Sequence, residues 1–181
     1  MGALQATSLL IRDKCDILIH INVNVNKSAP AYDRIRAFQA TCEEYHVPYD
    51  IDLSVKGDSY HELLDVIREI FNKIESKYPD QKKGIFLAND TYANMFLNLI
   101  FQKYGTFPST YEIVGFDNSP IASEAILPIT TIGQQIDVIA KTAMDLLVQQ
   151  MEEQKKRVPK PLGEPIHKQI TPILIRRNTT E

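Results

Sequence analysis

The sequence predicts an α/β fold in which a mostly parallel sheet is covered by helices on both faces. Short apolar runs alternate along the chain with longer segments whose apolar side chains recur every three or four positions. Strands that alternate with helices indicate parallel strands buried between two helical layers. The length of 181 residues corresponds to about one domain.

The first predicted elements are a helix over residues 4–12 and a short buried strand over residues 16–22. A polar loop follows, and a second helix is expected over residues 30–45. Pro30 suits its first turn, where a missing backbone N–H costs nothing. One face of this helix carries apolar side chains at Ile35, Phe38 and Cys42.

Residues 49–54 alternate like a strand, and a third helix is expected to begin just after them. Ser59 and Glu62 have the spacing of a capping box, in which each satisfies a backbone N–H of the helix start. The apolar stripe of this helix consists of Leu63, Leu64, Ile67, Ile70, Phe71 and Ile74.

Residues 84–88 form the next predicted strand, followed by a helix over residues 91–104. Gly105 stands where a helix commonly ends in a left-handed residue. Residues 111–116 then read as another buried strand, which runs directly into Asp117.

The last third contains a short strand over residues 129–132, a long helix from about residue 136 to residue 151 and a final strand over residues 170–176. Between helix and strand, the run EEQKKRVPKP at residues 152–161 is interpreted as a frayed helix end and a linker. Its charges indicate a solvated face rather than a nucleic-acid site, since the chain as a whole is acidic.

Composition excludes several classes of protein. The formal net charge is −3 and the pI about 5.8, which argues against a sequence-independent grip on phosphate backbones. No apolar run could span a bilayer, and the N-terminus does not resemble a secretory signal. Cys15 and Cys42 lie in apolar surroundings, as expected of buried reduced thiols. We therefore expect a cytoplasmic globular protein.

Polar side chains gather where the predicted strands end. Ligands of open parallel sheets bind beyond the carboxyl ends of the strands, so these positions are candidates for a site. Asn89 and Asp90 could instead cap a helix, and Asp117 could open a turn. Several such groups at successive strand ends favour a site for a polar small molecule. They are Asn22, Asn89, Asp90, Asp117, Asn118 and Gln134, with Arg34 in the helix after the first strand.

Catalytic and metal-binding patterns are missing from the sequence. It contains no nucleophile elbow, phosphate-binding loop or dinucleotide-binding turn. Its four histidines lack metal-ligand spacing, and His20 is interpreted as a packed residue of a strand. We expect no enzyme activity, no metal and no cofactor, although a hydrolase or transferase using Asp117 is an alternative.

Short segments along nearly the whole chain form an ordered set of motifs. These are GALQATSLLI at residues 2–11, RIRAF at 34–38, LAND at 87–90, IVGFDN at 113–118, PITTI at 128–132 with Gln134, and LIRRNT at 174–179. The set resembles the effector-binding domain of the lactose-repressor/galactose-repressor (LacI/GalR) family of bacterial transcription regulators. Departures at Lys14 (a glycine in the family), Ala37 (also a glycine) and Asn118 (an aspartate) concern ligand specificity rather than the fold.

The resemblance implies a periplasmic-binding-protein-like (type I) fold, of which this chain is the C-subdomain, a three-layer αβα sandwich with flavodoxin-like strand order. Residues 1–134 would form the C-subdomain, and residues 135–162 a helix and linker that pack with the N-subdomain in the intact family. Residues 163–181 would return as the last strand. The helix-turn-helix domain and most of the N-subdomain would lie outside this sequence.

The resemblance also implies an effector site. Carried over by position, Arg34, Asn89 and Asp117 would hydrogen-bond the effector, and Gln134 would lie beside them. Ser59 and Ile136 occupy places where an aromatic side chain often stacks on a sugar in the family, with Tyr60 as a substitute. Met95, Phe96, Ile121 and Ala122 are candidates for homodimer contacts, although core packing explains the first two equally well.

The function that this resemblance implies is sensing of a small-molecule effector, expected to be a sugar or sugar derivative, by a dimeric regulator. Operator DNA would be bound only through the absent N-terminal domain. An extracytoplasmic sugar-binding protein of a transport system shares the fold and is the alternative.

Overall fold

A computed structural model shows one six-stranded sheet with helices on both faces, and it describes residues 1–156, 158 and 163–181. The strands are β1 Ile17–Ile21, β2 Tyr49–Asp52, β3 Lys83–Leu87, β4 Tyr111–Asp117, β5 Thr130–Gly133 and β6 Ile173–Ile175. The helices are α1 Gly2–Arg12, α2 Pro30–Glu44, α3 Tyr60–Lys77, α4 Asp90–Tyr104, α5 Pro120–Glu124 and α6 Ile136–Gln154.

The strand order is β2-β1-β3-β4-β5-β6. All neighbouring pairs from β2 to β5 are parallel, and β6 alone pairs antiparallel with β5. This order confirms the mostly parallel αβα sandwich, and its first five strands have the flavodoxin-like order that the resemblance implied.

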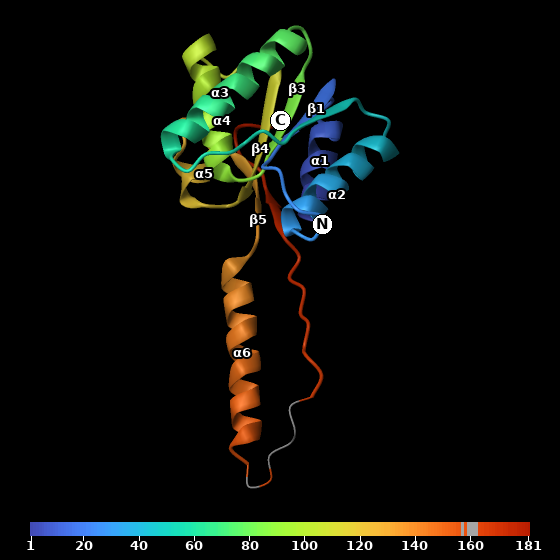
Figure 1. Cartoon of the computed structure of the whole chain (residues 1–181), viewed down its shortest axis with the longest axis vertical. Coiled ribbons are helices and arrows are strands. Elements are labelled where there is room, and N and C mark those ends of the chain that lie inside the picture. The colour runs from blue at the N-terminus through green and yellow to red at the C-terminus, as the bar shows by residue number, and fades with distance from the viewer. Residues whose placement is uncertain (157, 159–162) are drawn as a thin grey trace.

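Helices lie on both faces of the sheet (Figure 1), and a hydrophobic cluster fills the space on each face. Alternate side chains of β1, such as Ile19, pack beneath α3 and α4, where Ile67 and Phe96 are fully buried. The opposite side chains, such as Leu18, pack beneath α1 and α2, where Leu10 and Phe38 are fully buried. Strands buried on both faces explain why the sequence shows continuous apolar runs rather than alternation.

The predicted helix ends are confirmed at several places. Ser59 and Glu62 form the capping box at the start of α3, with bonds in both directions. Gly105 ends α4 with a φ of 70°, in the left-handed region that glycine enters without steric cost. Lys14 adopts a φ of 58° just after α1, in the left-handed region, although it is not a glycine.

Most elements lie within two residues of their predicted bounds, and two differ more. The short helix α5 was missed, because its five residues, which begin with Pro120, are too few to show a helical period. The last strand covers only Ile173–Ile175 rather than residues 170–176, since the preceding residues run outside the sheet. Both cysteines are buried and free, as expected.

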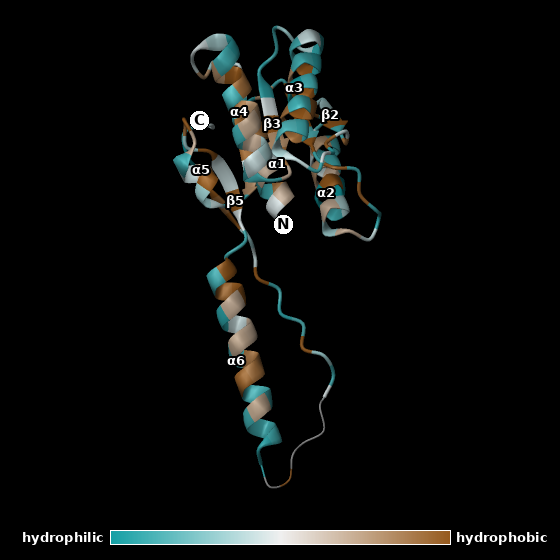
Figure 2. Cartoon of the chain, turned by 60° about the vertical axis from the view of Figure 1, so that its left-hand side comes forward, coloured by the Kyte–Doolittle hydropathy of each residue, from teal (hydrophilic) through white to brown (hydrophobic). Residues whose placement is uncertain are grey.

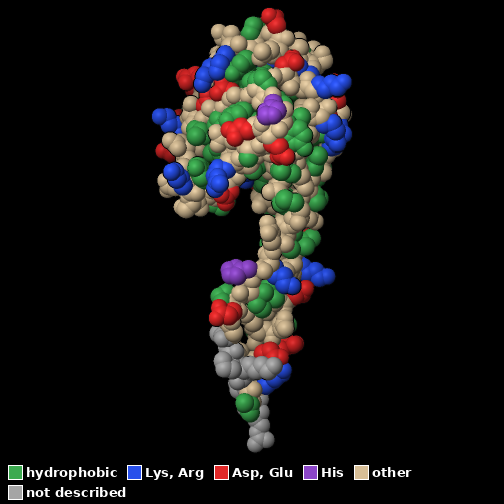
Figure 3. All heavy atoms as spheres, turned by 90° about the vertical axis from the view of Figure 1, so that its right-hand side faces the viewer, with side chains coloured by type: hydrophobic (Ala, Val, Ile, Leu, Met, Phe, Trp, Pro, Cys, Tyr) green, Lys and Arg blue, Asp and Glu red, His purple; other side chains and the backbone are tan. Residues whose placement is uncertain are grey.

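Helix α6 stands apart from the rest of the molecule. It extends away from the sheet beside the returning chain, and none of its residues is buried (Figure 1). Hydrophobic and hydrophilic residues alternate along it (Figure 2), and it forms a narrow arm below the body (Figure 3). Its exposed apolar residues are Ile136, Val138, Ile139, Met144, Leu147, Val148 and Met151.

The predicted linker over residues 152–161 is described only in part. The helix ends at Gln154, and residues 157 and 159–161 lie outside the described residues. Within the described part of the chain, no helix is both long enough and apolar enough to cross a membrane. Of the suggested dimer contacts, Met95, Phe96 and Ala122 are fully buried, so core packing accounts for them.

Candidate functional site

Each parallel strand delivers a loop to the same edge of the sheet, and the candidate residues occupy these loops or the helix starts that follow. Arg34 lies early in α2, Asn89 at the start of α4, and Asp117 at the end of β4. Because β1, β3, β4 and β5 run parallel, their carboxyl ends meet at one edge, which is where ligands bind in such folds.

The Arg34 guanidinium lies over the Phe116 ring at this edge. Its Nη1 donates to the Ala88 carbonyl oxygen at 2.6 Å, and its Cζ lies 3.6 Å from the centre of the Phe116 ring. Burial lowers the pKa of Arg34, while the nearby Asp117 carboxylate raises it. A guanidinium nevertheless stays charged in proteins and offers five N–H donors in a planar fork. Arg34 can therefore present fixed donors to a ligand.

Asp117 has an unusual backbone conformation. Its φ is 102° and that of Asn118 is 55°, so two successive non-glycine residues have positive φ. Such residues cost about 1 to 3 kcal/mol each and persist only where the surrounding structure holds them. The Asp117 Oδ1 accepts a hydrogen bond from Nε2 of Gln134, in the loop after β5. A ligand hydroxyl could replace this amide, because both are neutral donors.

Buried Asp90 ties together the loops that carry these groups. Its Oδ1 accepts from Thr131 Oγ1 at 2.6 Å, and its Oδ2 accepts from the Ser119 backbone N–H at 2.7 Å. Burial raises the pKa of Asp90, whereas these hydrogen bonds oppose the rise. Position 115 of the IVGFDN motif requires glycine, because a Cβ there would collide with Asp90 Oδ1.

Two hollows open at this edge, of about 230 Å³ and about 260 Å³. Pockets for drug-sized ligands measure about 300 to 1,000 Å³, so each hollow suits only part of a ligand or a small polar molecule. The first is lined by Asp117, Asn118, Gly133, Gln134, Gln135, Ile136, Asp137, Ile173 and Ile175. The second is lined by Met1, Gly2, Ala3, Pro30, Asp33, Arg34, Ala37, Phe116 and Gln134.

The structure brings some of the predicted site residues together. Gln134 lines both hollows, with Arg34 in one and with Asp117 and Ile136 in the other. Ile136, the first residue of α6, is 66% exposed. The Arg34 guanidinium and the Asp117 carboxylate thus lie on the same side of the molecule, with Gln134 between them.

Of the effector residues that the resemblance implies, three line neither of these two hollows. Asn89 caps α4, because its side chain accepts a hydrogen bond from the Tyr92 backbone N–H at 2.9 Å. Ser59 caps α3, and Tyr60 is an exposed residue in the first turn of that helix. The capping function considered for Asn89 is therefore observed, and an additional part in ligand binding stays a prediction.

Sequence reasoning did not identify Phe116 as part of the site or Asp90 as an anchor between strands. Phe116 supports the Arg34 guanidinium, and its position directly before Asp117 at a strand end was the available signal. Asp90 had been considered as a group of the ligand site or as a helix cap, but not as a link between strands. Its contacts with Ser119 and Thr131 lie 29 and 41 residues away, beyond any local pattern.

Comparison with known proteins gives the same fold. Residues 9–180 match the family described as "Periplasmic binding protein-like domain". The ribose operon repressor of Halalkalibacterium halodurans is 26% identical over 178 residues, which cover 98% of this chain and 50% of that protein. The chain spans about half the length of the curated relatives it matches.

Two solved structures illustrate the likeness. A LacI family transcriptional regulator from Enterococcus faecium with bound ribose matches with a TM-score of 0.74 at 19% identity, covering 99% of this chain and 62% of that chain. A LacI family regulator from Arthrobacter sp. FB24 in complex with lactose matches with a TM-score of 0.78 at 18% identity and the same coverages. The resemblance found in the sequence motifs is confirmed by these relatives.

Proposed function

This chain belongs to the family of periplasmic binding protein-like domains, and from that premise we propose that it is the effector-sensing part of a LacI-type transcription regulator. Its curated relatives include ribose operon repressors, and solved structures of similar fold hold ribose or lactose. The observation that carries the proposal is the placing of Arg34 and Asp117 at the carboxyl edge, each bonded only to neutral groups among the described residues.

A sugar fits this chemistry. Its hydroxyls both donate and accept, so the Asp117 carboxylate can accept from one hydroxyl while the Arg34 guanidinium donates to another oxygen. Asn89, which follows Ala88, and Gln134, which lines both hollows, would add uncharged hydrogen-bonding groups for the sugar. Ser59, Tyr60 and Ile136 would contribute from the starts of α3 and α6.

The chain would supply one wall of the site, as residues 1–134 with the return segment 163–181. The exposed apolar side chains of α6 support the proposal that residues 135–162 pack with an N-subdomain. An effector bound between two subdomains would stabilise their closed arrangement and so alter operator binding by a DNA-binding domain in a homodimer. Such a shift requires a higher affinity of the effector for one arrangement than for the other.

Repressors among the curated relatives favour regulation over the alternative of a transport protein. A DNA-binding measurement separates the two, because a transport protein has no operator affinity for a sugar to change.

The proposal is tested on the complete regulator by calorimetry and by operator binding, with D-ribose, lactose, sugar phosphates and nucleobases as ligands. Arg34→Ala and Asp117→Ala should each abolish the response to the effective ligand while leaving operator binding in its absence unchanged. Arg36→Ala is the matched control, since Arg36 lies exposed on the same helix. A normal response in both site variants would refute the assignment.

A further inference from the structure

The left-handed Asp117–Asn118 turn needs an external support, because neither residue is glycine. Such support comes from Arg177, which follows β6 near the C-terminus. Its Nη2 donates to the Asn118 Oδ1 at 2.7 Å, and its Nη1 donates to the Ile129 carbonyl oxygen at 2.8 Å. One guanidinium therefore joins the turn after β4 to the residue before β5.

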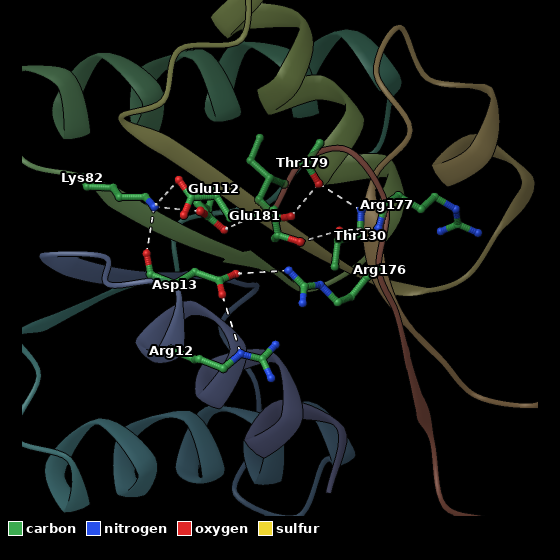
Figure 4. Close-up of polar contacts among 11 residues, drawn as sticks. Arg12, Asp13, Lys82, Glu112, Thr130, Arg176, Arg177, Thr179 and Glu181 are labelled. Carbon is green, nitrogen blue, oxygen red and sulfur yellow. Dashed lines mark hydrogen bonds and ion pairs between the residues drawn. The ribbon is translucent and has the colours of Figure 1, made fainter.

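Arg177 is itself fixed by buried hydrogen bonds. Its backbone N–H donates to Thr130 Oγ1 at 2.8 Å, and the Thr130 N–H donates to Thr179 Oγ1 at 2.9 Å. Thr179 is fully buried and its hydroxyl donates to the Ile113 carbonyl oxygen at 2.7 Å. Figure 4 shows Thr130 and Thr179 beside Arg177. The arginine thus extends from a segment anchored on β4 and β5.

We infer that Arg177 is a positioning residue, which holds Asn118 in its left-handed conformation and thereby keeps the Asp117 carboxylate at the effector site. The inference rests on the proposed function, because Asp117 is the group that would accept hydrogen bonds from the effector. Without Arg177, Asn118 can relax toward negative φ, and the preceding carboxylate turns with the peptide plane.

The neighbouring Arg176 provides a matched control. It has the same charge and lies on the same segment, but it points toward Asp13 while Arg177 points away from it (Figure 4). Its Nη2 lies 4.0 Å from Asp13 Oδ2, and its side chain is 45% exposed. Removing Arg176 changes the net charge as much as removing Arg177 and leaves the turn untouched.

The conformation of the turn is measured first, without any ligand, from backbone amide NMR signals of the full 181-residue chain. Arg177→Met should shift or broaden the signals of Asp117, Asn118 and Ser119, whereas Arg176→Met should leave them in place. Adding Asn118→Gly to Arg177→Met should restore sharp signals, because glycine adopts positive φ without strain. If Arg177→Met fails to fold, Asn118→Ala gives the same test while sparing the bond to Ile129.

Affinity is measured next, by titrating the complete regulator with D-ribose. Arg177→Met should weaken binding about tenfold, which corresponds to about 1.4 kcal/mol, and Asn118→Gly should recover most of that loss. Arg176→Met should bind like the parent. If the parent does not bind D-ribose, this effector assignment fails while the amide signals still decide the inference. Unchanged amide signals in Arg177→Met, or a folded double variant without recovery of those signals, would overturn it.

Discussion

Charged side chains are used differently at the two ends of the parallel strands, the amino edge where the strands begin and the carboxyl edge where they end. At the amino edge, Lys82 Nζ lies 2.9 Å from a Glu112 carboxylate oxygen and 3.2 Å from one of Glu181 (Figure 4). At the carboxyl edge, Arg34 donates to a backbone carbonyl and Asp117 accepts from a glutamine amide. Charges paired with opposite charges stabilise the fold, whereas charges bonded to neutral groups keep their strongest interactions available for a ligand.

The largest expected effect comes from breaking the amino edge. Burial alone would lower the pKa of Lys82, but Glu112 and Glu181 outweigh it and raise that pKa. Lys82→Met leaves the Glu112 carboxylate, whose side chain is 2% exposed, without its cation. We expect a loss of about 3 to 5 kcal/mol in the free energy of unfolding, measured with urea.

The control for Lys82→Met is Arg68→Met. Arg68 pairs with Asp65, and the two side chains are 45% and 70% exposed, so its removal should cost no more than about 1 kcal/mol. Equal losses in the two variants would contradict the structural importance of the amino edge.

A pH effect of intermediate size reports on the region between the edges. Burial lowers the pKa of His20 to about 4, the Phe86 carbonyl opposes this, and the Arg34 charge lowers the pKa further. The unfolded chain has the ordinary value of 6.5, so between pH 6.5 and 4 it binds more protons than the folded chain. Stability should therefore fall as the pH is lowered through this window, by up to about 3 kcal/mol.

His20→Gln should remove that dependence, while substitution of the exposed His61 should not. Asp90 and Glu112 have raised pKa values, so their contribution changes in the opposite direction, and it cancels in the difference between parent and variant. If the stability of His20→Gln depends on pH in the same way as that of the parent, His20 is not the group that causes the loss of stability.

The smallest change in stability is expected at the carboxyl edge. Asp117→Asn removes one charge, as Lys82→Met does, but Gln134 can bond either an amide or a carboxylate. Unfolding free energy should change by less than about 0.5 kcal/mol. Calorimetric melting checks this, and a loss of 2 kcal/mol or more would mean that both edges serve the fold.

The sequence allowed most of the fold to be predicted, because strands buried on both faces leave continuous apolar runs and helices leave a period of 3.6. β1, β3 and all but the last residue of β4 are buried throughout. The helix α5 escaped prediction, since a single turn has no period.

The site was only partly predictable. The closeness of Arg34, Asp117 and Gln134 was predicted, because strand ends and the helices that follow them can be located in the sequence and parallel strands bring them to one edge. The groups that hold the site were not found. Arg177 and Asn118 are 59 residues apart, and their contact depends on the antiparallel return of β6.

The junction between the body and the arm has a mechanical consequence. Gln135 leaves β5 with a φ of 51°, and its Nε2 donates to the carbonyl oxygen of Thr171 in the returning chain at 2.6 Å. The segment that leaves the body and the segment that returns to it therefore lie side by side at this point. Two adjacent connections restrict twisting and sideways tilt of the arm relative to the body. Rotation about the line through both connections is the motion that they restrict least.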